Sequence, residues 1–351
     1  MSTEKPVISC KNVWKLFGAD PEKYLAKMSP DMSFDDMRAD GYIAGVKDVS
    51  LDVFKGEMLV IMGLSGSGKS TLVRCFSRLH EITGGTIEVD GQDIMSLAEK
   101  DLIDLRRSKM GMVFQSFGLL PHRSVLDNVA FPLEMRGQDK HTRRARALEV
   151  IKLVGLEGRE EYFPRELSGG QQQRVGIARS LVIEPDIWFL DEPFSALDPL
   201  IRKEMQDEFL RLQSVLHKTI LFVTHDFDEA LRLADRIAIM KDGIIEQLDT
   251  PANIVLNPAT EYVRKFTEEV PREKVLKIES VMDAFDSSES MSDLTVQNSA
   301  IIETVAEVIL SSSKPLTVVD DAGKAVGTIT AAKIVHVLFG SHSTQRSENA
   351  S

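Results

Sequence analysis

Hydrophobic and polar residues near the start of the chain follow the spacing of β-strands. Apolar residues alternate with polar ones in 7–14 and 46–54 and are nearly continuous in 57–62, so each stretch predicts a strand. The turn at 55–56 makes the last two a strand pair. Residues 18–45, which contain two prolines, interrupt the pattern and predict a short helical insertion.

Strand-like and helical stretches then alternate. The strand-like stretches are short, and those at 187–190 and 220–223 are apolar throughout, which is typical of strands buried on both faces. We expect such strands at 86–89, 110–114, 187–190 and 220–223, and helices at 71–80 and 143–153. This alternation predicts an α/β fold with a largely parallel central sheet.

The character of the chain changes after about residue 270, where serine becomes frequent. The segment 286–293 reads as a solvated loop. The elements expected beyond it are a helix at 301–310, strands at 316–319 and 326–330 joined by a turn at 320–323, and a helix at 331–339. We therefore predict a first domain over 1–270, a small α+β domain over 271–340 and a polar tail over 341–351.

Composition narrows the class of protein. The chain has 351 residues, enough for about two domains. Its 42 basic and 54 acidic residues give a net charge of -12, which argues against a general nucleic-acid binder. Cys10 and Cys75 are expected to be reduced thiols. Neither a targeting segment nor an apolar run of about 18 residues is visible, so any membrane role is expected to act through a partner.

The most specific motif is GLSGSGKS at 63–70, which has the spacing of a phosphate-binding loop. It follows an apolar strand and precedes a helix. Its glycines let successive backbone N–H groups point at phosphate oxygens, and the start of the helix adds a favourable partial charge. Lys69 is expected to reach the β- and γ-phosphates, and the Ser70 hydroxyl to bind Mg²⁺.

A second motif places two acids at the end of an apolar strand, as Asp191 and Glu192 in 186–193. Ligands bind at this end of parallel strands. Asp191 suits a contact to Mg²⁺ through water, and Glu192 suits a general base that activates the attacking water.

A third motif, LSGGQ at 167–171, precedes a helical stretch at 172–182. Ser168 is expected to cap this helix, and the paired glycines expose backbone N–H groups. The segment reads either as a second anion-binding helix terminus or simply as a serine-capped helix.

Together these motifs resemble the ATP-binding subunit of ATP-binding-cassette (ABC) transporters over about residues 7–265. The resemblance implies an ABC-type P-loop ATPase with a RecA-like core, an antiparallel β subdomain and an α-helical signature subdomain. In this family Gln115 is the Q-loop glutamine, 167–171 is the signature, 195–198 is the D-loop and His225 is the switch histidine.

The resemblance implies roles for individual residues. Glu192, His225 and Gln115 are implied for catalysis, and Ser70, Gln115 and Asp191 for Mg²⁺. The full set implied for ATP is Gly63, Ser65, Gly66, Ser67, Gly68, Lys69, Ser70, Thr71, Gln115, Ser168, Gly170, Gln171, Asp191, Asp198 and His225. An aromatic residue is also expected to stack on adenine, and both Phe17 and Tyr42 are candidates.

The resemblance also implies partners. Ser168, Gly170 and Gln171 would contact the ATP held by a second copy of the chain, so that two copies pair head to tail around two ATP molecules. The dimer would dock on transmembrane permease subunits that work with a periplasmic or extracellular substrate-binding protein. No nucleic acid is implied. The expected location is the cytoplasmic face of the bacterial inner membrane.

Three features together resemble the glycine betaine/proline/choline (quaternary amine) importer ATPases: the insertion at 18–45, the sequence at 63–75 and the appended C-terminal module. The module resembles a single cystathionine-β-synthase-type (CBS) motif through 281–282, 315–320 and 326–330. It would serve a regulatory or dimerisation role. Two alternatives remain: an importer ATPase for another small solute such as an amino acid, and a soluble regulatory ATPase without a transport role.

Overall fold

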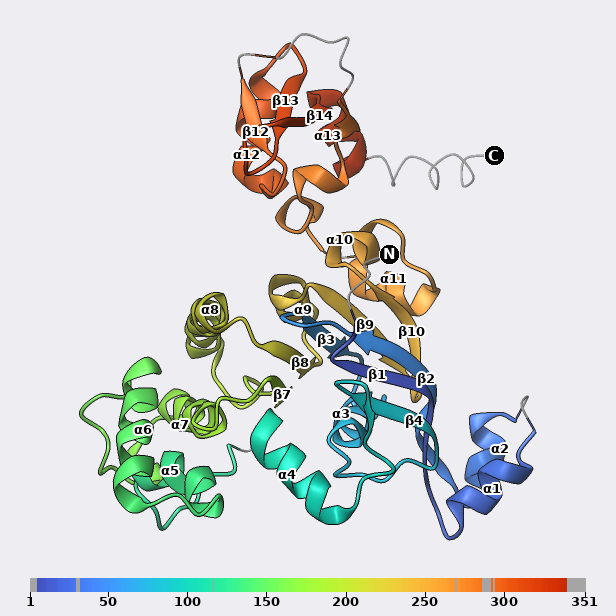
Figure 1. The fold of residues 1–351 in the computed structure, drawn as a ribbon. Coiled ribbons are helices and arrows are strands. Elements are labelled where there is room, and N and C mark those ends of the chain that lie inside the picture. The colour runs from blue at the N-terminus through green and yellow to red at the C-terminus, as the bar shows by residue number, and fades with distance from the viewer. Residues whose placement is uncertain are drawn as a thin grey trace. The chain divides into compact units, whose positions relative to one another are not determined.

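The computed structural model describes residues 5–29, 32–115, 117–268, 270–285, 292 and 294–339. Within these residues the chain folds as two compact units, one that ends at Asp249 and one that begins at Thr250 (Figure 1). The second unit begins earlier than the predicted boundary at 270/271. The difference arises because Ala252 and Leu256, on α10 (Pro251–Leu256), pack against the core of the second unit.

The N-terminal strands of the first unit form an antiparallel sheet in the order β2–β1–β4–β5. The expected helical insertion joins β1 to β2 as two short helices, the second capped by Ser33 and Asp36. The bounds of these elements are β1 (Ile8–Phe17), α1 (Pro21–Lys27), α2 (Phe34–Ala39), β2 (Ile43–Val53), β4 (Gly84–Val89) and β5 (Gln92–Asp93).

A larger sheet in the order β10–β9–β3–β8–β7–β6 is parallel except for β10. The expected pairing of the strands before and after the turn at 55–56 is wrong, because β3 pairs with β8 and β9 while β2 pairs with β1. Every residue of β3 is buried, which suits the interior of a parallel sheet. The strands are β3 (Met58–Met62), β6 (Met110–Val113), β7 (Ile187–Asp191), β8 (Thr219–Thr224), β9 (Arg236–Lys241) and β10 (Ile244–Asp249).

Helices connect these strands, and α5, α6 and α7 pack against one another as a helical group beside the sheets (Figure 1). This grouping agrees with the expected α-helical subdomain. The helices are α3 (Lys69–Phe76), α4 (Glu99–Lys109), α5 (Val125–Met135), α6 (Lys140–Leu153), η1 (Pro164–Glu166), α7 (Gly169–Leu181), α8 (Pro199–Leu216) and α9 (Phe227–Leu233).

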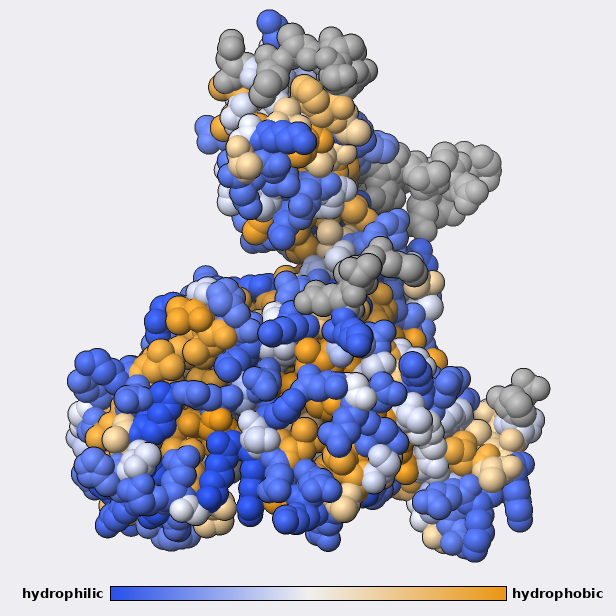
Figure 2. Space-filling view, viewed as in Figure 1, coloured by the Kyte–Doolittle hydropathy of each residue, from blue (hydrophilic) through white to orange (hydrophobic). Residues whose placement is uncertain are grey.

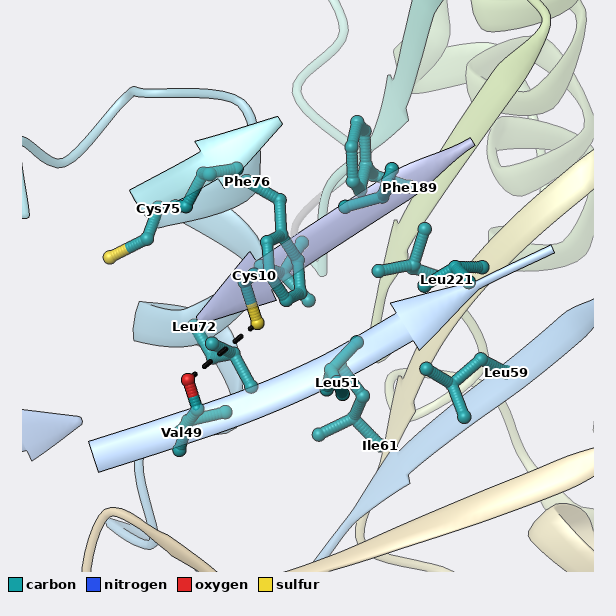
Figure 3. Close-up of a cluster of buried hydrophobic side chains, with 14 of the residues drawn as sticks. Cys10, Val49, Leu51, Leu59, Ile61, Leu72, Cys75, Phe76, Phe189 and Leu221 are labelled. Carbon is teal, nitrogen blue, oxygen red and sulfur yellow. Dashed lines mark hydrogen bonds between the residues drawn. The ribbon is translucent and has the colours of Figure 1, made fainter. Parts of the chain in front are cut away.

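Side chains from both sheets and from α3 share one hydrophobic core (Figure 3). Cys10 and Cys75 lie in it as free thiols, and the Cys10 thiol donates to the carbonyl of Val49. Burial raises the pKa of each thiol to about 12. Both cysteines are therefore structural residues in their reduced form.

The second unit contains a small sheet in the order β11–β14–β13–β12, with α12 and α13 packed on each other. The helices and strands expected between 301 and 339 are confirmed, whereas the loop at 286–293, apart from Ser292, and the tail at 341–351 lie outside the described residues. The remaining elements are α11 (Glu261–Thr267), η2 (Arg272–Lys274), η3 (Ile278–Ser280), β11 (Asp283–Ala284), β12 (Thr295–Gln297), α12 (Ile302–Ser311), β13 (Leu316–Val319), β14 (Ala325–Ile329) and α13 (Ala331–Phe339). Among the described residues, none of the helices has the length and apolar character needed to span a membrane.

Candidate functional site: a phosphate loop at the carboxyl ends of parallel strands

The phosphate loop leaves the carboxyl end of β3 and enters α3 at Lys69. Two of its glycines are required by close backbone approach. A Cβ on Gly63 would clash with the carbonyl oxygen of Met240, and one on Gly68, whose φ is +102°, would clash with that of Gly45. The loop therefore packs closely against the backbones of β9 and β2, and only glycine fits at these two positions without a clash.

The Lys69 ammonium lies inside the loop. Its Nζ donates to the carbonyl oxygens of Gly63 at 2.9 Å and Leu64 at 3.0 Å. Burial lowers the pKa of Lys69, and the nearby carboxylates of Glu192 and Asp191 oppose that shift. The ammonium and the N-terminus of α3 therefore place positive charge at one spot, which suits the phosphates of a nucleotide.

Ser70 and Asp191 meet beside the loop. The Ser70 hydroxyl donates to Asp191 Oδ1 at 2.7 Å, and Arg74 Nη2 lies 3.4 Å from Asp191 Oδ2. Hydroxyl and carboxylate oxygens are ligands that Mg²⁺ prefers, and in phosphate sites Mg²⁺ binds one or two protein groups together with substrate oxygens and water. The described residues contain no cluster of three or more His, Cys, Asp or Glu side chains that could hold a metal by itself. The donor pair thus fits a Mg²⁺ ion that arrives with a nucleotide.

The three residues predicted for catalysis come together around Glu192. Gln115 Nε2 donates to Glu192 Oε2 at 3.2 Å, and His225 Nδ1 lies 3.2 Å from the same oxygen. The three residues follow β6, β7 and β8, which are neighbours in the sheet. Glu192 has φ +46°, and its backbone N–H donates to the Val223 carbonyl at 3.0 Å. The carboxylate is thus held between an amide donor and an imidazole, in a position to accept a proton.

The signature residues are held by a different element, α7. Ser168 Oγ accepts from the Gln171 N–H at 3.3 Å, and the Gln171 side chain accepts from the Ser168 N–H at 3.0 Å, so the pair forms a capping box. A Cβ on Gly170 would lie 2.8 Å from Ile201 Cγ2, which explains the need for a small residue. Asp198 likewise caps α8, accepting from the Ile201 N–H at 3.1 Å.

The structure separates the two aromatic candidates for adenine stacking. Tyr42 already stacks on Tyr24, with ring centroids 3.9 Å apart. Phe17 is 40% exposed. A Cβ on Gly45 would lie 2.8 Å from the Phe17 ring and 3.0 Å from Thr71 Cγ2, so Phe17 lies close to the first turn of α3. Phe17 makes an edge contact with His80, and Lys15 Nζ lies 5.0 Å from the centre of its ring. Phe17 is the better placed of the two candidates because its ring is near the phosphate loop, whereas the Tyr42 ring is stacked on Tyr24.

Sequence reasoning missed a polar network behind His225. Asp226 caps α9 by accepting from the Glu229 N–H, and Arg202 Nη1 lies 3.6 Å from the other Asp226 oxygen. Arg202 Nη2 also donates to the carbonyl of Leu197 in the D-loop at 3.2 Å. Burial raises the pKa of Glu229, which accepts from Gln206 Nε2 at 2.9 Å. The Asp-x-x-Glu spacing at 226–229 was the available signal for the cap, but the arginine contact has no local sequence signal.

A cavity of about 420 Å³ lies on the first unit beside the Q-loop, the segment 115–118, of which the structure describes Gln115, Phe117 and Gly118. Its wall combines apolar and arginine side chains from α4, β6, α5 and α7. Arg136 has a buried Nη2 without a hydrogen-bond partner in the described structure. The lining includes Arg106, Phe114, Phe131, Met135, Arg136 and Arg179.

Comparison with known proteins identifies the family. The model of the ABC transporter family matches residues 46–195. The chain is 70% identical, over 95% of its own length and 97% of the relative's, to the trimethylamine N-oxide transport system ATP-binding protein TmoW of Ruegeria pomeroyi. The chain belongs to the ATP-binding subunits of ABC transporters.

A glycine betaine relative of this ABC subunit is similar over a smaller part of its length. The chain is 51% identical to the glycine betaine transport ATP-binding protein OpuAA of Bacillus subtilis, over 80% of the chain and 67% of the relative. Among solved structures, the dimeric MJ0796, a bacterial ABC transporter cassette, matches with 36% identity and a TM-score of 0.58, covering 70% of the chain and 98% of the cassette. The same cassette is known in a post-hydrolysis state bound to ADP and phosphate. The ABC subunit is therefore an ATP-binding ATPase, and its phosphate loop is the expected nucleotide site.

Proposed function

We propose that Glu192 is the general base for ATP hydrolysis and that Gln115 and His225 orient it and the attacking water. The observation that carries this assignment is the convergence of both side chains on Glu192 Oε2, each at 3.2 Å. Lys69 would bind the β- and γ-phosphates. Ser70 and Asp191 would hold Mg²⁺, which neutralises charge on the phosphate oxygens when bound.

We propose that two copies of the chain form the working ATPase, with Ser168, Gly170 and Gln171 completing the site of the partner. The similar cassette is described as dimeric. An apolar surface supports the pairing, since Leu200, which follows the D-loop at the start of α8, is 80% exposed. Figure 2 shows apolar side chains gathered over the region of α7 and α8.

We propose that the transported solute is trimethylamine N-oxide. The support is the 70% identity to TmoW over nearly the full length of both chains, whereas the glycine betaine relative is covered to 67%. Glycine betaine and choline are the second candidates, because all three solutes carry a nitrogen with three methyl groups. The solute contacts would lie on a permease and a substrate-binding protein, so the ATPase itself contributes energy rather than recognition.

We propose that the permease docks at the cavity beside the Q-loop, on the cytoplasmic face of the membrane. A cavity lined by apolar side chains together with arginines suits a short helix that carries a carboxylate. For the second unit, the order β12–α12–β13–β14–α13 supports the proposed CBS-like module with a regulatory or dimerisation role.

Uptake of radiolabelled trimethylamine N-oxide tests the solute and the chemistry together. Cells that carry the wild-type chain should accumulate the label, and cells that carry Glu192→Gln should not. Unlabelled glycine betaine, choline and proline serve as competitors. Radiolabelled glycine betaine is tested in parallel. If only this second label accumulates, and does so only in cells with the wild-type chain, the ATPase assignment stands and glycine betaine replaces trimethylamine N-oxide as the solute. Equal uptake of both labelled solutes in the two strains would refute the transport assignment.

A further inference from the structure

The guanidinium group of Arg179 bonds the Q-loop to α7, the helix that begins at the signature. Arg179, on α7, donates from Nη1 to the Gly118 carbonyl at 2.6 Å and from Nη2 to the Phe117 carbonyl at 3.0 Å. These are two consecutive backbone acceptors, and the planar fork of arginine matches them where the compact ammonium of lysine would reach one.

The Q-loop backbone needs such an external contact. Phe117 has φ +57° and Gly118 has φ +59°, so both lie in the left-handed region, which a phenylalanine rarely adopts. The backbone of α7 also comes close, since a Cβ on Gly176 would lie 3.6 Å from the Phe117 carbonyl oxygen. Burial lowers the pKa of Arg179, so the guanidinium depends on these carbonyls for its hydrogen bonds.

Arg179 lies where the Q-loop, the helix that begins at the signature and the cavity beside the Q-loop meet. The Q-loop that it holds begins at Gln115, whose amide donates to Glu192. The helix that carries Arg179 begins at the capping residue Ser168. Arg179 and Gly118 also line the cavity beside the Q-loop. A displacement of the Q-loop relative to α7 would therefore move Gln115 away from Glu192.

We propose that Arg179 is a positioning residue that fixes the Q-loop to α7 and thereby holds Gln115 at Glu192 for hydrolysis. The inference rests on the proposed role of Glu192 as general base. It assigns to Arg179 an effect on turnover rather than on ATP binding, because Arg179 contacts neither the phosphate loop nor α3 in the hydrogen bonds described for it.

The test is Arg179→Lys in the purified full-length chain, with steady-state ATP hydrolysis and thermal unfolding measured on the same samples. Arg174→Lys is the matched control. Arg174 lies on the same helix and also bonds a backbone carbonyl, that of Val154 at 3.1 Å, but this carbonyl lies outside the Q-loop. We expect kcat to fall about tenfold in Arg179→Lys with the KM for ATP within about twofold, and Arg174→Lys to keep the wild-type kcat.

A double-mutant cycle with Gln115→Ala separates positioning from general damage. If Arg179 acts through Gln115, adding Arg179→Lys to Gln115→Ala lowers kcat no further; independent, multiplicative losses would overturn the inference. Gly118→Ala provides a second variant in case Arg179→Lys does not fold, because its added Cβ would lie 3.3 Å from Arg179 Nη2 and disturb the same contact. Wild-type kcat in Gly118→Ala, or in a folded Arg179→Lys, would also overturn it.

The variant Glu192→Gln separates a failure of the positioning role of Arg179 from a failure of the general-base role of Glu192. If Glu192→Gln is inactive while Arg179→Lys behaves like Arg174→Lys, the positioning role alone fails. If Glu192→Gln hydrolyses ATP normally, the proposed function fails first, whatever the Arg179 variants do.

Discussion

Glu192→Gln removes one proton acceptor and leaves the shape of the site nearly unchanged. The new amide oxygen can still accept from Gln115 Nε2, and the strand and backbone contacts of the residue do not involve its side chain. General-base catalysis contributes about 10²- to 10⁴-fold to a rate, which corresponds to about 3–5 kcal/mol of the activation barrier. We expect kcat to fall by that factor. ATP binding should persist, because Lys69 is untouched and a negative charge beside the phosphates is removed.

The assay is phosphate release at saturating ATP, combined with the measured mass of the protein in solution with ATP present. Glu192→Gln should accumulate as an ATP-bound dimer, since binding is retained and hydrolysis is slow. Glu184→Gln is the matched control, because Glu184 also has a positive φ, +53°, and precedes β7 rather than following it. Multiple-turnover hydrolysis by Glu192→Gln at the wild-type rate, with the control equally active, would refute the general-base assignment.

Three further predictions follow from the described contacts. Phe17→Ala should raise the KM for ATP at least about fivefold, because base stacking on an aromatic ring contributes about 1–3 kcal/mol, whereas Tyr42→Ala should leave it near the wild-type value; equal effects would reject the choice of Phe17. The pKa of Glu229 in the folded chain is raised above its ordinary value of 4.5, so the folded state binds this proton more tightly than the unfolded state. The free energy of unfolding contributed by Glu229 therefore falls as the pH rises above 4.5. Glu229→Gln should therefore raise the melting temperature more at pH 8 than at pH 5, and parallel melting curves across pH would contradict this. Cys10 and Cys75 should resist a maleimide in the native chain and react after denaturation, because their pKa of about 12 and their burial suppress the thiolate; rapid native labelling would show that the core is open.

Much of the site was predictable because most of its residues belong to short, contiguous sequence motifs. The phosphate loop, the two acids at the end of β7 and the histidine after β8 are each delivered by an apolar strand, and parallel strands bring their carboxyl ends to one edge. The contacts of Gln115 and His225 with Glu192 follow from that arrangement. The helical insertion and the elements of the second unit between 301 and 339 were also visible in the pattern.

The features that escaped prediction depend on partners distant in the chain. The strand before the turn at 55–56 and the strand after it look like a hairpin locally, yet β3 pairs along its two edges with the parallel strands β8 and β9. The choice between Phe17 and Tyr42 depended on Tyr24, which occupies the Tyr42 ring. In the sequence Arg179 is indistinguishable from the other arginines of its helix. Its role depends on the fold, which brings the carbonyl groups of Phe117 and Gly118 within hydrogen-bond distance of its side chain.

The order of the larger sheet also distinguishes the three residues proposed for catalysis by how many neighbouring strands support each of them. The strands that deliver Glu192 and His225, β7 and β8, each have a hydrogen-bonded neighbour on both sides. Gln115 follows β6, one of the two edge strands of the described sheet, which has a strand partner on one side. Of the three residues proposed for catalysis, Gln115 is therefore the one whose strand has the least support from the sheet, whereas Glu192 and His225 follow strands of its interior.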